Sequence, residues 1–251
     1  MLFRSLIPRY DLILTYGGGE PVVSAYERLG ARACIPIYNA LDPDTHHPVA
    51  PDPRFVCDLA LLANRLPDRE ARVEEFFLNV AARISNKEFV LGGNGWGDKP
   101  LTKNTTYVNH VYTKDHNAFN STPRAILNVN RESMARYGFS PPTRIFEAAG
   151  AAACVITDDW QGIDMFLESG REVLIARDGH DVGEHLRSLT FGRAKAIGNE
   201  ARRRILSEHT YAHRALQLQE ILNGRYTPAP ALRSSFLIDP SKQNPIPEVS
   251  A

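Results

Sequence analysis

Short apolar runs of strand-forming residues alternate along this chain with segments of helical periodicity, and this alternation limits the fold more than any other feature. The first 40 residues hold one such unit. An apolar run over 10–16 ends in Gly17-Gly18-Gly19, residues 20–29 have helical spacing, and 33–38 form a second run. Strand–helix–strand order is typical of parallel pairing. The pattern predicts an α/β fold with a Rossmann-like parallel sheet covered by helices on both faces.

A proline-rich break at 42–52 interrupts this pattern, and a longer series of strands and helices follows it. We predict four regions: a truncated βαβ part of one Rossmann-like domain (1–41), a linker (42–53), a second Rossmann-like domain (54–225) and a Pro-rich tail (226–251). In the second domain we expect strands at 58–63, 89–91, 125–129, 154–157 and 172–176 and helices at 69–84, 114–119, 143–149, 163–167 and 182–190, with one long helix or two shorter ones over 193–222.

Composition excludes several classes of protein. The 29 Lys+Arg balance 29 Asp+Glu, so net charge gives no general attraction to nucleic acid or anionic lipid. The three cysteines are widely spaced, without the spacing of a zinc site, and we expect buried thiols. The longest apolar stretch is too short to span a bilayer, and charges interrupt the N-terminus. We therefore expect a cytoplasmic protein with no transmembrane segment and no nucleic-acid partner.

Ligands of open parallel sheets bind beyond the carboxyl ends of the strands, beside helix N-termini, and three segments occupy such places. The first is 64–69, directly after the strand at 58–63, where Asn64, Arg65 and Arg69 lie at a strand-to-helix turn. Two arginines there could hold a diphosphate. A solvated helix start explains the same residues.

The second segment is 92–97, with the sequence GGNGWG. Glycines such as Gly93 allow close approach of a ligand to the backbone, Asn94 adds a polar side chain, and Trp96 could form a wall for a base or sugar. The spacing is neither that of a dinucleotide fingerprint nor that of a P-loop. A tight turn with a packed tryptophan is an equal alternative.

The third segment is 140–150, SPPTRIFEAAG, where Thr143 opens a helix whose free N–H groups favour an anion. Arg144 adds positive charge, and Glu147 lies one turn further along among apolar residues. A carboxylate in such surroundings needs a partner, which a pair of ribose hydroxyls or an arginine would supply.

The sequence gives less support to a metal site than to a diphosphate site. Asp158-Asp159 follows a strand and could bind a metal, but no further ligand stands at a recognisable spacing from it. His209 and His213 share a helix face, which more often serves packing or capping than zinc binding. We therefore expect neither a metal nor another cofactor.

Six ordered segments carry a family likeness: 39–48 (NALDPDTHHP), 127–131 (LNVNR), 140–150 (SPPTRIFEAAG), 155–158 (VITD), 170–174 (GREVL) and 208–214 (EHTYAHR). Taken together, they resemble the CgeB-like (spore maturation protein) glycosyltransferases, a branch of the GT-B group with a group 1 glycosyltransferase C-terminal domain. The likeness extends from about Tyr10 to Leu222.

This resemblance implies two Rossmann-like domains, an acceptor side in the N-terminal half and a nucleotide-sugar site in the C-terminal half. It implies transfer of a sugar from a nucleotide-diphosphate sugar to an unidentified acceptor, with positive side chains in place of a metal. It assigns no catalytic residue. The substrate-binding residues that it implies, together with those of the three segments above, are Asn64, Arg65, Arg69, Gly93, Asn94, Trp96, Thr143, Arg144 and Glu147.

Two features depart from the family pattern. Related enzymes often carry another Glu eight residues before the ribose-binding one, and here that position is Phe139. The region before the linker is also shorter than an acceptor domain. A homo-oligomer or a partner chain could complete it. Two alternative functions stay open: a non-catalytic binding or assembly module, and a nucleotide-sugar epimerase of the same fold.

Overall fold

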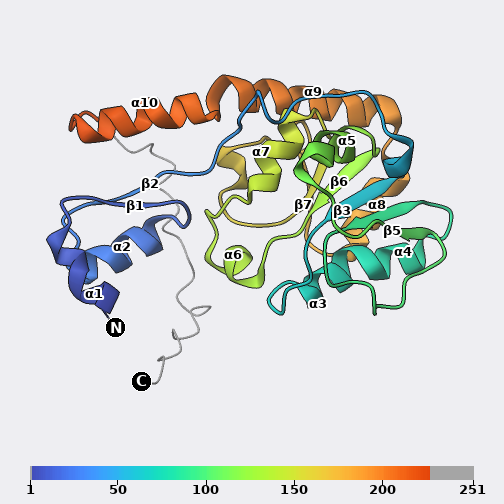
Figure 1. The fold of residues 1–251 in the computed structure, drawn as a ribbon, viewed down its shortest axis with the longest axis horizontal. Helices are drawn as coiled ribbons and strands as arrows, with labels where there is room; N and C mark the ends of the chain where they lie inside the picture. Colours follow the sequence, from blue (N-terminus) through green and yellow to red (C-terminus); the bar gives the residue numbers. More distant parts are fainter. Residues whose placement is uncertain (1, 227–251) are drawn as a thin grey trace.

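Two parallel sheets organise the chain in the computed structural model, which describes residues 2–226 (Figure 1). The smaller sheet pairs β1 (Ile13–Thr15) with β2 (Cys34–Pro36). The larger sheet contains β3 (Leu59–Leu62), β4 (Phe89–Gly92), β5 (Thr105–Tyr107), β6 (Ala125–Asn128), β7 (Val155–Asp158) and β8 (Leu174–Ala176). The predicted Pro-rich tail lies, apart from Tyr226, outside the described residues.

Ten α-helices connect and cover these strands within residues 2–226: α1 (Leu2–Leu6), α2 (Glu20–Arg28), α3 (Glu70–Val73), α4 (Asn79–Arg83), α5 (His116–Ser121), α6 (Glu132–Tyr137), α7 (Thr143–Gly150), α8 (Gly179–Ser188), α9 (Phe191–Glu208) and α10 (Tyr211–Leu222). A π-helical turn, Glu74–Leu78, joins α3 to α4, so the predicted helix at 69–84 forms with an irregular centre. The segment at 193–222 is two helices. The predicted helix at 163–167 is a 3₁₀ turn, Ile163–Met165.

The strand order of the larger sheet is β5-β4-β3-β6-β7-β8, and every neighbouring pair is parallel. The chain runs outward from β3 to β5, then returns to place β6 on the other side of β3. This reversal is a topological switch point, where loops leave the carboxyl edge in opposite directions and open a crevice. The predicted fold class is confirmed.

Alternate residues of each strand enter two separate cores, as the pleat of a doubly covered sheet requires. Leu59 and Leu61 of β3 join the core beneath α4 and α8, whereas Ala60 joins the core beneath α5 and α7. Helix α9 packs against both cores, through Ala194 at its start and Ile205 near its end. The larger sheet is therefore the middle layer of three.

The helices and the cysteines can be compared with the sequence-based expectations. In the part of the chain that is described, no helix combines the length and the apolar character needed to cross a bilayer. Cys34, Cys57 and Cys154 are buried free thiols, as predicted, and burial raises the pKa of each above its usual value.

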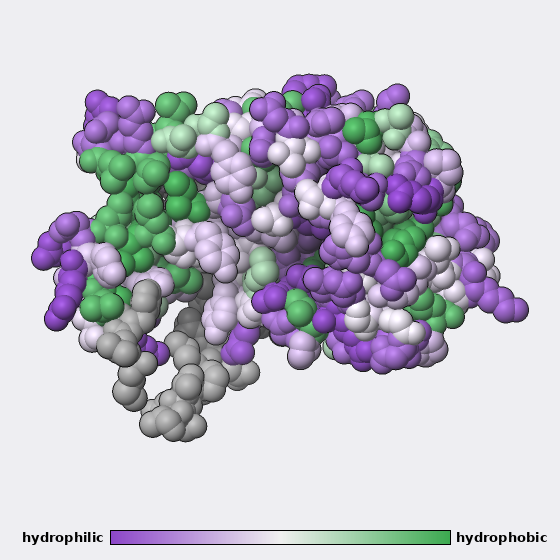
Figure 2. Space-filling view, viewed as in Figure 1, coloured by the Kyte–Doolittle hydropathy of each residue, from purple (hydrophilic) through white to green (hydrophobic). Residues whose placement is uncertain are grey.

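The N-terminal β1–α2–β2 unit contributes little to either core. Helix α2 buries none of its side chains, and Figure 2 shows apolar side chains gathered on the surface at this end of the molecule. The unit attaches to α10: Leu41 N–H donates to His209 C=O (2.8 Å), and Tyr211 N–H donates to Leu41 C=O (3.0 Å). The Arg214 Nε donates to Tyr38 C=O (3.1 Å). These bonds join the segment that follows β2 to the start of α10.

A glycine loop of the same unit meets the segment that leads into α7. Gly18 N–H donates to Ser140 Oγ (3.1 Å), with φ of +78° at Gly18. A Cβ atom on Gly19 would lie 2.7 Å from the Phe139 ring. Only a residue without a side chain allows the loop to approach so closely.

His209, at the break between α9 and α10, is buried beside Phe146 and Phe166. Arg214 Nη2 donates to its Nδ1 (3.0 Å), so the neutral ring carries its proton on Nε2. Burial, reinforced by Arg214, lowers the pKa of His209 to about 3.

We expect the free energy of unfolding to fall as the pH drops below 6.5, because the unfolded chain protonates His209 and the folded chain does not. The contribution is complete above 6.5 and is lost progressively towards pH 3, by roughly 1.4 kcal/mol per pH unit at most. His209→Asn keeps an acceptor for Arg214 and should remove this part of the pH dependence. Urea unfolding between pH 7 and 4.5 measures it.

His180→Gln is the matched control, since the His180 side chain is 73% exposed. It should unfold with the pH dependence of the original chain. Identical pH profiles for His209→Asn and the original chain would contradict the assignment.

Candidate functional site

A cavity of about 360 Å³ lies at the carboxyl edge of the larger sheet, at the switch point. Loops that follow β3, β4, β5 and β6 form its walls, together with the first turn of α7 and one residue of α5. The lining residues are Leu62, Ala63, Asn64, Leu66, Arg69, Gly93, His110, Val111, His116, Arg131 and Arg144. Three arginines and two histidines thus face one space, and within residues 2–226 no carboxylate lines it.

Each arginine reaches the cavity from a helix start. Arg69 and Arg131 directly precede α3 and α6, and Arg144 is the second residue of α7. Helix α7 begins without a side-chain cap, so its first N–H groups add partial positive charge. Two carboxylates lie at the periphery: Glu147 is 3.4 Å from Arg144, and Asp68 is 3.9 Å from Arg131.

The positive charges in this cavity act on one another. Burial lowers the pKa of Arg69, and Arg131 and Arg144 lower it further. Its Nε is buried without a hydrogen-bond partner. Burial also lowers the pKa of Arg144, against the opposing effect of Glu147. A bound anion would relieve this repulsion and supply the missing acceptor.

Two histidines complete the polar lining. His116 interacts through Nε2 with Val111 C=O (3.2 Å), and burial and Arg144 lower its pKa. His110 lies in the loop after β5, 3.5 Å from Asn94 Nδ2, and packs edge-on against Tyr112. The Val111 carbonyl accepts from His116 Nε2, so the neutral His116 ring offers a ligand an acceptor at Nδ1, whereas His110 accepts from Asn94 at Nδ1 and can donate from Nε2.

Four of the sequence-predicted residues meet in the cavity: Asn64, Arg69, Gly93 and Arg144. Asn94 supports them, since its N–H donates to Asn64 Oδ1 (2.9 Å). They come from three separated segments, and the switch point brings them together.

Arg65 does not take the place expected for it. Its guanidinium pairs with Glu70 (2.7 Å) and Asp98 (2.8 Å), and it is absent from the cavity lining. These carboxylates neutralise the charge that the diphosphate prediction assigned to Arg65.

The prediction that Trp96 forms a ligand wall is wrong. Its side chain is 0% exposed and packs in the core beneath α4. Its Nε1–H donates to Ala63 C=O (2.7 Å). Trp96 therefore closes the β4 loop onto β3 from inside the protein.

Thr143 and Glu147 flank Arg144 on α7, outside the lining. Thr143 is exposed at the first helical position. The Glu147 carboxylate, half-buried, is 3.4 Å from Arg144 and 4.0 Å from His46 of the predicted linker. Its observed partners are the arginine and the histidine, so a ribose-binding role stays a prediction.

Sequence reasoning missed Arg131, His110 and His116 as lining residues. Arg131 follows the apolar run at 125–129 as closely as Arg65 follows the run at 58–63, and that position was the available signal. The histidines gave no signal, because they lie near an edge strand that the pattern does not reveal.

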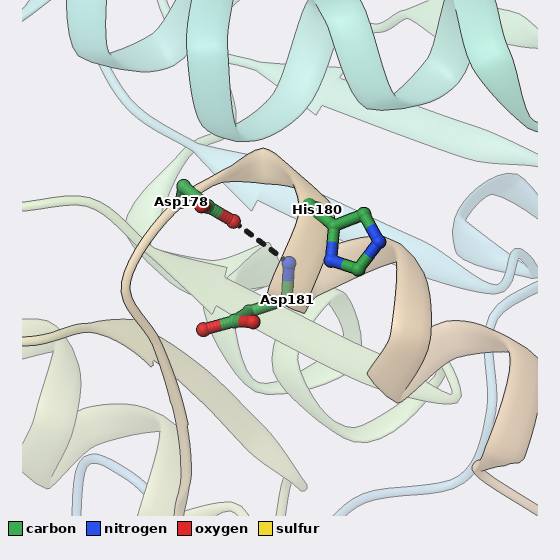
Figure 3. Close-up of side chains that lie close together, drawn as sticks. All are labelled: Asp178, His180 and Asp181. Carbon is green, nitrogen blue, oxygen red and sulfur yellow. Dashed lines mark hydrogen bonds between the residues drawn. The ribbon is translucent and has the colours of Figure 1, made fainter.

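Asp178, His180 and Asp181 form an exposed group of potential metal ligands, with ligand atoms within 4.8 Å of one another (Figure 3). Asp178 accepts the N–H of Asp181 (2.9 Å) and so caps α8, and Asp181 accepts from Arg177 (2.7 Å). Capping and ion pairing account for both carboxylates.

The topology and the cavity define an α/β protein with an arginine-lined crevice at its switch point. A family model described as "Glycosyl transferase-like" matches residues 69–220, more than half of the chain. The chain belongs to this family. No curated protein matches the sequence.

Solved structures share the fold at low sequence identity. HepE from Anabaena, solved with UDP-glucose, has a TM-score of 0.66 at 12% identity over 88% of this chain and 66% of HepE. Sucrose-phosphate synthase from Thermosynechococcus elongatus has a TM-score of 0.66 at 15% identity over 88% and 60%. TarM of S. aureus has 0.65 at 14% over 90% and 45%. The chain thus has the GT-B glycosyltransferase fold and spans less than two thirds of the length of these proteins.

Gly93→Ala should destabilise the protein and reshape the cavity. Gly93 has φ of +111°, and an added Cβ atom would lie 2.2 Å from Ala63 C=O, which strand β3 fixes. We expect the free energy of unfolding to fall by roughly 1–3 kcal/mol, measured by urea denaturation.

Gly97→Ala in the same loop is the matched control. Its nearest contact, with the Tyr107 ring, is an ordinary 3.8 Å, so the change should stay within about 0.5 kcal/mol. Equal losses for the two variants would refute the steric explanation.

Proposed function

We propose that the cavity binds the diphosphate of a nucleotide-diphosphate sugar and that the protein transfers the sugar to an acceptor. The observation that carries this proposal is the convergence of Arg69, Arg131 and Arg144 on one cavity, which no carboxylate of the described part of the chain lines. Family membership supports it, and so does HepE, solved with UDP-glucose on the same fold. The cavity volume of about 360 Å³ lies within the range of small-molecule sites, roughly 300–1,000 Å³.

Loss of a nucleoside diphosphate is the difficult step of sugar transfer, because the departing group gains negative charge. Guanidinium groups fixed at helix starts stabilise that charge without rearranging, which lowers the barrier to bond breakage. Arg69 and Arg144 are well placed for this because burial strengthens their interaction with an anion. Positive side chains thus take the part that a metal would play, and we propose a metal-independent reaction.

Finer assignments belong to the same proposal. The ordered segments described above favour the CgeB-like branch, with Glu147 and Thr143 beside the bound nucleotide. Asn64 and Gly93 would border the donor, and Asn94 would hold Asn64 in place. We propose a cytoplasmic location, because the buried free thiols suit a reducing compartment.

Calorimetric titration with UDP, GDP and UDP-glucose tests the donor site. Arg69→Gln, Arg131→Gln and Arg144→Gln should each weaken binding about 10-fold to 100-fold, because each removes a charge-assisted hydrogen bond. Product analysis by mass spectrometry then separates transfer from epimerisation and from binding alone.

Arg203→Gln is the control, since Arg203 lies on α9 with its side chain 68% exposed. It should bind nucleotide as the original chain does. Failure of the original chain to bind any nucleoside diphosphate, or unchanged binding by all three cavity variants, would overturn the proposal.

A further inference from the structure

A buried carboxylate lies behind the cavity, outside its lining. Asp158, the last residue of β7, is 0% exposed. Arg72 of α3 pairs with it through Nη2 (2.7 Å), and Asn130 N–H donates to its Oδ1 (3.1 Å). A buried charge costs stability unless such partners compensate it. Within residues 2–226, no side chain of the cavity lining donates a hydrogen bond to Asp158, although the charge of Asp158 acts on Arg69.

The two partners hold the backbone of one residue, Asn130, on both sides of its Cα atom. Asp158 accepts the N–H of Asn130, and Arg72 Nε donates to the C=O of Asn130 (3.2 Å). Arg72 therefore bridges the Asp158 carboxylate and the Asn130 carbonyl. The Asn130 backbone, just beyond the end of β6, is fixed by side chains of β7 and α3.

Arg131 follows directly, and its backbone is held on the other side as well. Glu132 N–H donates to Asp68 C=O (2.8 Å), so residues before and after Arg131 are both tied to neighbouring segments. The Arg131 side chain, 45% exposed, has only a distant carboxylate at 3.9 Å. Its direction into the cavity is thus set by the backbone and not by a strong side-chain partner.

Stability alone does not explain why the chain holds the buried pair of Asp158 and Arg72. Buried ion pairs contribute little net stability, and an apolar pair of similar size often stabilises more. What an apolar pair cannot do is bind the backbone N–H and the backbone C=O of Asn130. Burial also raises the pKa of Asp158, with Arg72 and the Asn130 amide opposing it, so the carboxylate depends on these contacts to stay ionised.

We infer that Asp158 and Arg72 are positioning residues, which fix the backbone N–H and C=O of Asn130 and thereby aim Arg131 at the anion in the cavity. This inference rests on the proposed function, in which that anion is the diphosphate of the donor. Asp158 does not touch the anion, and its effect passes through Arg131.

The test is a double-mutant cycle with inorganic pyrophosphate as the probe, titrated by calorimetry. Asp158→Asn and Arg131→Gln should each weaken pyrophosphate binding about tenfold, and the double variant should bind no more weakly than Arg131→Gln alone. Losses that multiply in the double variant would show general damage and overturn the inference. So would unchanged binding by Asp158→Asn, or no binding of pyrophosphate to the original chain.

Amide hydrogen exchange without any ligand gives a second readout. In Asp158→Asn, peptides covering 129–132 should exchange about tenfold faster, whereas α9 should be unchanged. Asp159→Asn is the matched control, because Asp159 is next to Asp158 in sequence but is exposed. This variant should behave as the original chain in both experiments. Unaltered exchange at 129–132 in Asp158→Asn would also overturn the inference.

These readouts separate the inference from the proposed function. A chain that binds pyrophosphate with a non-additive cycle but binds no nucleoside diphosphate would retain the positioning role and lose the proposed donor. A chain that binds UDP through Arg131 with an additive cycle would keep the donor and lose the positioning role.

Discussion

The pairing of β3 with β6 is the contact on which the site depends. β3 already pairs with β4, and by also accepting β6 it reverses the direction in which the sheet grows. The loops after β3 and β6 then separate at their carboxyl ends, and the space between them is the cavity. Without this pairing, Arg69 and Arg131 would have no reason to face the same volume.

Much of the sheet could be predicted from the sequence, because five of its strands are apolar runs. The missing elements carry no such pattern. β5 (Thr105–Tyr107) is an edge strand with no buried residue, and α6 (Glu132–Tyr137) buries none of its side chains. Periodicity reports burial on a repeating face, so elements that bury little are hidden from it. The strand order was also hidden, because it depends on pairs far apart along the chain.

Individual site residues show the same limit. Arg65 and Arg69 lie in one turn and look equivalent in sequence, yet Asp98 arrives from the β4–β5 loop and neutralises only Arg65. Trp96 stands among glycines, which predicts an exposed loop, but Ala63 C=O offers its indole N–H a buried acceptor. Local chemistry suggested the candidate residues, and partners from distant parts of the chain decided which of them face the cavity.

The contact between the segment after β2 and the start of α10 limits how the β1–β2 unit can move. The outgoing segment at Leu41 and the returning segment at Thr210 lie side by side in a parallel bridge. Sliding one past the other would break the bonds of Leu41 with His209 and Tyr211, whereas a small rotation about the line they define would keep them. Rotation of the β1–β2 unit about this line would be limited by the hydrogen bond of Gly18 with Ser140, in the segment that leads into α7.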